Sequence, residues 1–114
     1  MLIGELAERT GVAPRLLRYY GEQGLLSSTR NTSGYRVYDD EAVARVLQIR
    51  KLLAAGLTTE MIAGMLDCAT GPAAHLDLCP ELVRRLRSEL AETDRRIGAL
   101  AQQREVLAGY LGQA

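Results

Sequence analysis

Arginine and tyrosine side chains that suit contact with DNA gather in one short stretch near the N-terminus. The segment from Arg15 to Tyr20 carries two residues of each type. Arginine offers a planar fork of donors to phosphate or guanine, and a tyrosine hydroxyl can bond a phosphate oxygen while its ring packs on sugar or on a thymine methyl group. The pattern therefore predicts DNA contacts from Arg15, Arg18, Tyr19 and Tyr20. The alternative is an ordinary solvated face with both tyrosines in the core.

A second polar group follows a cluster of turn-forming residues after position 26. Arg30, Asn31 and Arg36 flank a segment in which β-favouring residues alternate, which predicts a small hairpin. If that hairpin lies beside a duplex, these three side chains can reach phosphates or the minor groove.

Cys68, His75 and Cys79 fall within or beside one loop. Two thiolates and an imidazole suit zinc or copper(I), and two thiols near arginines favour a redox disulfide. Two partly buried cysteines acting as small apolar groups, with a solvated histidine, are the third possibility. All three remain open, and we assign no cofactor.

Composition argues against catalysis and against membranes. A single histidine, no glycine-rich phosphate loop and no paired carboxylates predict that the chain is not an enzyme. The 14 basic residues cancel the 14 acidic ones, so any DNA-binding face must be a local patch. No basic leader and no apolar run long enough to span a bilayer are present, so we expect a cytoplasmic protein.

Short helices must position the candidate contacts. Apolar spacing predicts a first helix from Ile3 that stops at Gly11, and a second from Pro14 to about Gln23. Two short helices around a tight turn make a helix-turn-helix. A third helix should begin at a cap on Asp39 or Asp40, and Thr58 should cap a fourth.

The last predicted helix, from Pro80 to about Leu111, has a coiled-coil repeat. Spacings of three and four residues define a seam in which seven of nine residues are apolar. The apolar members are Val83, Leu86, Leu90, Ile97, Leu100, Leu107 and Leu111, and the polar members are Thr93 and Arg104. Such a helix is about 48 Å long, too long to be covered by its own domain, so we infer a homodimer. The alternative is a helix folded back onto its own domain.

Several motifs together resemble the mercury-resistance-regulator (MerR) family of bacterial transcription factors. They occur in order over about the first 66 residues, and the closing helix resembles the family's dimerisation helix. The motifs are Ile3-Gly4-Glu5-Leu6-Ala7, Thr10-Gly11-Val12, Leu17-Arg18-Tyr19-Tyr20, Gly24-Leu25-Leu26, Arg30, Gly34-Tyr35-Arg36-Val37-Tyr38 and Gly56-Leu57-Thr58.

The resemblance implies a mainly α fold, with a winged helix-turn-helix head, a small β-hairpin wing and a long helix that forms an antiparallel coiled coil. Arg18 and Tyr19 would project from the recognition helix, while Tyr35, Arg36 and Tyr38 would hold the wing and its phosphate contacts. It also implies a homodimer on a pseudo-palindromic promoter site of double-stranded DNA, with RNA polymerase as a partner. Regulation would come from distortion of the promoter spacer, which is indirect readout.

The expected organisation is a head over 1–70, a hinge loop over 71–79 and a dimerisation helix over 80–112, a short form without a separate effector-binding domain. Metal-sensing relatives use a cysteine at the position of Cys79, but its further ligands are missing here. The alternatives to the regulator are a thiol- or metal-responsive variant that uses Cys68, His75 and Cys79, and a coiled-coil module that binds proteins.

Overall fold

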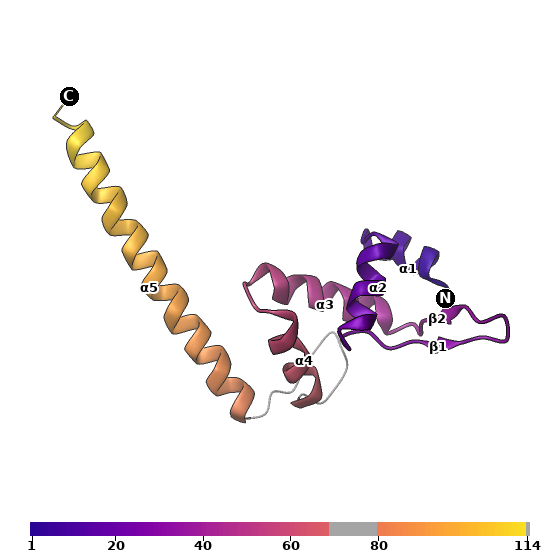
Figure 1. The fold of residues 1–114 in the computed structure, drawn as a ribbon. Helices are drawn as coiled ribbons and strands as arrows, with labels where there is room; N and C mark the ends of the chain where they lie inside the picture. The colour runs from indigo at the N-terminus through magenta and orange to yellow at the C-terminus, as the bar shows by residue number, and fades with distance from the viewer. Residues whose placement is uncertain (69–79, 114) are drawn as a thin grey trace. The chain divides into compact units, whose positions relative to one another are not determined.

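The computed structural model describes residues 1–68 and 80–113, with residues 67 and 68 described by backbone alone. Its contacts divide the chain into two units, 1–78 and 79–114, each coloured by sequence position in Figure 1. Within these described ranges, the first unit holds four helices and a hairpin, and the second holds one long helix. The mainly α fold class is confirmed. The predicted hinge over 71–79 lies outside the described residues, and the domain limits stay predictions.

The first two helices form the predicted helix-turn-helix. Helix α1 spans Ile3–Thr10 and α2 spans Pro14–Glu22. Gly11 ends α1 with a φ of 71°, a left-handed conformation that glycine adopts without steric cost. Its N–H donates to the Ala7 carbonyl over 2.9 Å. Pro14 begins α2, where its missing N–H removes no helical hydrogen bond.

The wing is a two-stranded antiparallel hairpin joined to the N-terminus. Strand β1 is Thr29–Arg30 and β2 is Arg36–Val37, with Thr29 opposite Val37. Residues 1 and 2 extend this pairing. Leu2 forms a bridge with Val37, and the Tyr38 N–H donates to the Met1 carbonyl over 2.8 Å. The Met1 ammonium in turn donates to the Tyr38 carbonyl over 2.7 Å, which fixes the wing to the start of α1.

Two further helices complete the first unit. Helix α3 spans Ala42–Ala54 and α4 spans Thr59–Cys68. The Thr58 hydroxyl accepts from the Met61 N–H over 3.2 Å, as its predicted capping role requires. The predicted start of α3 is wrong by about two residues. The Asp39 carboxylate accepts from the Glu41 N–H instead, in a turn that precedes the helix.

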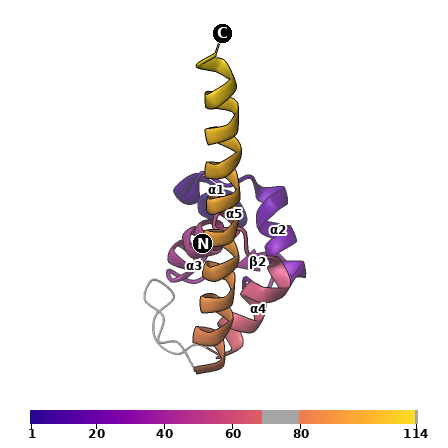
Figure 2. The ribbon, with the colours of Figure 1, turned by 90° about the vertical axis from the view of Figure 1, so that its left-hand side faces the viewer.

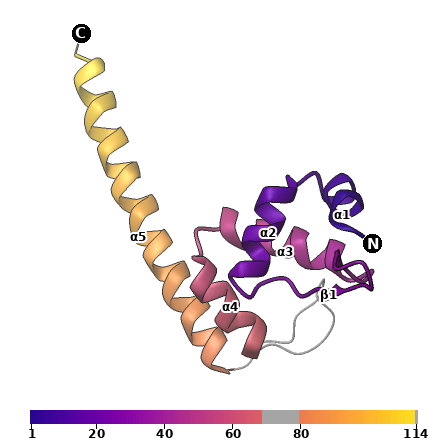
Figure 3. The same ribbon diagram turned by 45° about the vertical axis from the view of Figure 1, so that its right-hand side comes forward.

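In the first unit α1 packs against both α2 and α3, and Figure 3 shows these three helices together. Among the residues of this unit with a described burial, 1–66, the buried side chains all carry apolar or aromatic groups, so water exclusion holds the helices together. They are Leu6, Val12, Leu17, Tyr20, Leu25, Leu26, Tyr38, Ala42, Val46, Ile49, Leu57, Ile62 and Met65.

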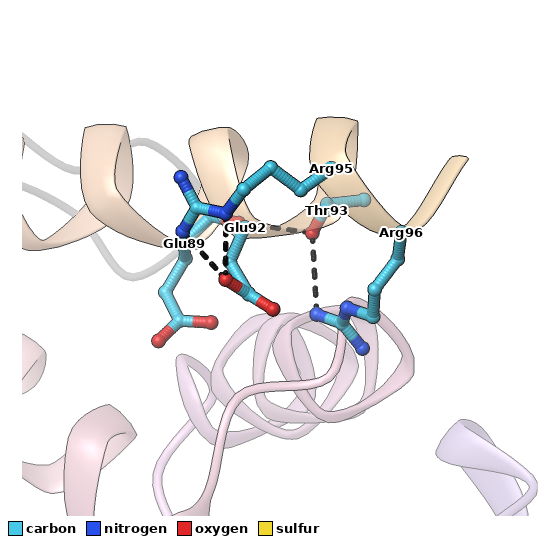
Figure 4. Close-up of polar contacts among 5 residues, drawn as sticks. All are labelled: Glu89, Glu92, Thr93, Arg95 and Arg96. Atoms are coloured by element: carbon cyan, nitrogen blue, oxygen red, sulfur yellow. Dashed lines mark hydrogen bonds and ion pairs between the residues drawn. The ribbon is translucent and has the colours of Figure 1, made fainter. Parts of the chain in front are cut away.

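The second unit is α5, Pro80–Leu111, an uninterrupted helix of 32 residues (Figure 2). It has the ends that the sequence predicts. Local contacts support its middle: Arg95 pairs with Glu92 at 2.5 Å, and the Thr93 hydroxyl donates to the Glu89 carbonyl over 2.9 Å (Figure 4). The Arg95 guanidinium, by hydrogen bond and charge, holds the pKa of the Glu92 carboxyl below its ordinary value of 4.5. Over the ranges that the structure describes, no helix has the length and hydropathy to cross a bilayer.

Candidate nucleic-acid interface

Helix α2 buries one face and exposes the other. Leu17 and Tyr20, three positions apart, are buried in the core, while Arg15, Arg18 and Tyr19 are exposed. The ring of Tyr19 is 43% exposed. Because side chains three or four positions apart share a helix face, the outward face presents two guanidinium groups and one phenol to solvent. This arrangement fits a recognition helix.

Two tyrosines predicted to contact DNA lie in the core, and the structure corrects that prediction. Tyr20 is 1% exposed and Tyr38 is 3% exposed, so neither ring can reach a duplex. Tyr20 lies near the end of α2, with its ring centroid 6.4 Å from that of Tyr19. Its spacing from Leu17 was the sequence signal for burial. Tyr38 follows β2 and is held by its backbone bonds to Met1.

The tip of the wing is ordered by Asn31. Its side-chain oxygen accepts hydrogen bonds from the N–H groups of Ser33 and Tyr35, each at 3.0 Å, as asparagine does in tight turns. Gly34 completes the turn with a φ of 83°. Asn31 was predicted from sequence to contact DNA. Its side-chain oxygen is engaged within the wing, where it shapes the loop, and the residue is exposed.

The remaining wing residues expose their functional groups. Tyr35 is 64% exposed, and Arg36 is half-buried. Arg30 is exposed and donates from Nη1 to the Gly34 carbonyl over 2.7 Å. That bond uses one of the five N–H donors of the guanidinium, so Arg30 can both support the turn and bind an anion.

An open groove of about 830 Å³ joins the start of α1, helix α2 and the wing. Arg18 from α2 and Arg30 and Arg36 from the wing line it together. The single acid in its lining is Glu5, which pairs with Arg9 at 3.0 Å. The groove is therefore a positively charged surface in a chain of zero net charge. The other lining residues are Leu2, Ile3, Gly4, Gly34 and Tyr35.

The contribution of the N-terminus to this groove was missed from the sequence. Leu2, Ile3 and Gly4 line it because the pairing of Leu2 with Val37 draws the chain start against the wing. A pairing of one or two residues between segments 35 positions apart leaves no periodic signal to read.

The predicted seam of α5 is largely open to solvent. Val83 and Leu86 are half-buried. The apolar seam residues further along are exposed, between 60% for Ile97 and 75% for Leu111, and they are Leu90, Ile97, Leu100, Leu107 and Leu111. A stripe of this kind on a single helix is an unusual surface for a monomer.

The residues proposed as a sensor from sequence are Cys68, His75 and Cys79. His75 and Cys79 lie outside the described residues, and Cys68 is described by backbone alone. Their role as metal ligands, redox pair or inert side chains stays open.

A short helix-turn-helix with a two-stranded wing, an exposed Arg and Tyr face and a groove of three arginines define a winged helix-turn-helix protein. Residues 1–68 match the family model of the MerR HTH family regulatory protein. The chain belongs to the MerR family, as its sequence motifs predicted.

Individual relatives match over different shares of their length. The HTH-type transcriptional regulator MerD of Shigella flexneri is 33% identical over 108 residues, which cover 90% of this chain and 90% of MerD. The nodulation protein NolA of Bradyrhizobium elkanii is 39% identical over 90 residues, which cover 78% of this chain and 40% of NolA. This chain thus spans less than half the length of NolA.

Among solved structures, HiNmlR, a MerR family regulator lacking the sensor domain and bound to promoter DNA, superposes with a TM-score of 0.65. The match covers 97% of this chain and 86% of HiNmlR at 20% sequence identity. At this identity the likeness concerns the fold, and it confirms the winged helix-turn-helix architecture with a long C-terminal helix.

Proposed function

We propose that this chain is a transcriptional regulator that binds a pseudo-palindromic promoter site as a homodimer. The observation that carries this proposal is the groove in which Arg18, Arg30 and Arg36 converge beside the exposed Tyr19. Guanidinium groups on a recognition helix and a wing suit phosphates on either side of one groove of a duplex. Membership of the MerR family and the likeness to MerD support a regulatory role.

The contact set of the proposal is narrower than the set expected from sequence. Arg15, Arg18 and Tyr19 on α2 and Arg30, Tyr35 and Arg36 on the wing are the direct contacts. Tyr20 and Tyr38 support the surface from the core, and Asn31 shapes the turn of the wing.

The second half of the proposal concerns the promoter. Two heads joined through α5 engage two half-sites, and the dimer distorts the spacer between them so that RNA polymerase meets aligned promoter elements. The energy of deforming base pairs that no side chain reads then adds to specificity. The protein acts in the cytoplasm and has no catalytic role.

The first prediction concerns Arg18. Replacing Arg18 with alanine removes one phosphate interaction per head, so the DNA affinity falls by about tenfold or more. The slope of log K against log salt becomes shallower by about 0.9 for each phosphate that is no longer neutralised. Fluorescence anisotropy with a labelled duplex at several salt concentrations measures both quantities.

The matched control is Arg95→Ala, which makes the same change of charge on α5, outside the seam and outside the head. Arg95 pairs with Glu92 on the exposed surface of the helix, and such a pair contributes little to stability. The control should keep both the affinity and the slope of the unaltered protein. An Arg18→Ala protein with an unchanged salt slope would contradict the role of Arg18.

A further inference from the structure

The two polar residues of the α5 seam are placed symmetrically within it. The midpoint of the seam lies between Gly98 and Ala99. The seam residues equidistant from it form pairs, which from the centre outward are Ile97 with Leu100, Thr93 with Arg104, and Leu90 with Leu107. Each polar residue therefore has its counterpart at the same distance from the midpoint. When two copies of this helix pair in opposite directions about that midpoint, every apolar seam residue from Leu86 to Leu111 faces an apolar one.

We propose that Thr93 and Arg104 set both the direction and the register of the α5 pair by facing each other across the seam. This inference rests on the proposed homodimer. In this register Thr93 of one subunit faces Arg104 of the partner subunit, twice by symmetry. The remaining layers pair Ile97 with the partner's Leu100, Leu90 with the partner's Leu107, and Leu86 with the partner's Leu111.

The chemistry of Thr93 suits an arginine partner. Its hydroxyl hydrogen is used within its own helix, because Oγ1 donates to the Glu89 carbonyl over 2.9 Å (Figure 4). The oxygen lone pairs accept one long contact of 3.5 Å from Arg96. A guanidinium has donors and no acceptor, so the partner's Arg104 can donate to the free acceptor capacity of Thr93.

Acidic residues beside Thr93 also favour the partner's Arg104 as its neighbour. Glu89 and Asp94 flank Thr93 on the two sides of the seam, and neither forms an ion pair within the residues described in the structure. Glu92, one residue away, is already paired with Arg95. Two unpaired carboxylates therefore lie within about one helical turn of the position that the partner's Arg104 reaches.

A parallel pair is disfavoured by the same residues. Parallel helices in register bring each seam residue against its own copy, so Arg104 would face the partner's Arg104. The flanking positions would bring Glu89 against the partner's Asp94. Both are contacts between like charges, and the antiparallel pair avoids them.

Antiparallel pairs shifted by one heptad are also disfavoured. A shift in one direction places Arg104 against the partner's Leu86, and a shift in the other places it against the partner's Leu100. Thr93 then faces Ile97 or Leu111. Each shifted register buries a guanidinium or a hydroxyl among apolar groups without a partner, which is unfavourable. A polar residue in an otherwise apolar seam often selects register in this way, with some loss of stability.

The test compares Thr93→Glu with Thr93→Gln in the full-length chain by analytical ultracentrifugation. Glutamate and glutamine have similar size and helix propensity, so their difference reports charge at position 93. In the proposed register the introduced carboxylate faces the partner's Arg104 in two layers, and the dimer dissociation constant of the glutamate variant should be about fivefold lower than that of the glutamine variant. Raising the salt concentration should reduce this difference.

A second pair of variants removes the guanidinium that attracts the introduced charge. With Arg104→Gln in both proteins, the advantage of glutamate over glutamine at position 93 should disappear. A glutamate variant that dimerises more weakly than the glutamine variant would overturn the register, because parallel or shifted pairs place the new carboxylate against its own copy or against an apolar side chain.

Disulfide trapping gives an independent readout. In a background with Cys68→Ser and Cys79→Ser, the pair Leu90→Cys and Leu107→Cys should cross-link the dimer on mild oxidation, and the pair Leu90→Cys and Leu100→Cys should not. The reverse pattern would overturn the register. An unaltered chain that sediments as a monomer would instead contradict the proposed homodimer, so the two failures are distinguishable.

Discussion

Neighbouring tyrosines on α2 have opposite environments. Tyr20 is buried, and its hydroxyl has no hydrogen-bond partner among the described residues, whereas Tyr19 faces solvent. Both residues occur in one motif beside Arg18, so residue type alone assigns them the same role. The position of each on the helix decides which one packs in the core and which one reaches the duplex.

The two hydroxyls are therefore predicted to respond differently to removal. Tyr20→Phe deletes a buried polar group without a partner and should raise the free energy of unfolding by about 1 kcal/mol, with DNA affinity unchanged. Tyr19→Phe should leave the stability unchanged and lower DNA affinity by about fivefold, because one phosphate hydrogen bond is removed. Urea denaturation and DNA titration of the two variants measure these effects. A large loss of affinity in Tyr20→Phe would contradict the core role of its ring.

The sequence predicts the position of a site residue when that position is set by residues close to it in the chain. Arg18 and Tyr19 are placed correctly because helical spacing from Leu17 fixes the face of α2 on which they lie. Tyr38 is misplaced because it pairs with Met1, which is 37 positions earlier in the chain. The pairing of the first residues with the wing also builds the groove that three arginines line. Residue spacing along the chain gives no sign of this pairing.

At the scale of elements, the wing is a turn held by one side chain. Asn31 accepts from two backbone N–H groups, and the hairpin strands are only two residues each. A hairpin this short has little stability of its own, so its order depends on Asn31 and on the bridge to Leu2.

Two substitutions of Asn31 should distinguish the effect of wing shape on DNA binding from the effect of wing charge. Asn31→Ala removes both acceptor contacts and should speed amide hydrogen exchange at Ser33 and Tyr35, with weaker DNA binding. Asn31→Asp keeps the acceptor and the slow exchange, but its carboxylate repels phosphate, so binding should still weaken. Hydrogen exchange followed by NMR and DNA titration give the two readouts. Slow exchange in Asn31→Ala would show that the wing does not depend on this side chain.

The observed helix ends agree with those predicted from sequence where a single residue determines the end. Gly11 stops α1 through its left-handed backbone, and Pro80 begins α5. The start of α3 is harder to place because Asp39 and Asp40 are both good caps, and the backbone uses Asp39 in the preceding turn. Competing caps of equal strength leave an end uncertain by about two residues.

At the scale of the whole molecule, zero net charge is compatible with DNA binding because the charges are distributed unevenly. The groove of the head gathers three arginines, whereas acids on α5 lie near the arginines of the same helix. Attraction to DNA then comes from this local cluster of arginines in the head, and α5 remains available for pairing. Composition predicts neither distribution, since it counts charges and does not place them.

The measurement that tests the central claim most directly is selection of binding sites from a random duplex library with the purified full-length protein. A homodimer with one recognition surface per subunit should enrich an inverted repeat, because the two-fold symmetry of the protein is reflected in the site. The Arg18→Ala protein, selected in parallel, should enrich it weakly or not at all. Failure of the unaltered protein to enrich any sequence, or enrichment of a single half-site without symmetry, would contradict the proposed dimeric regulator.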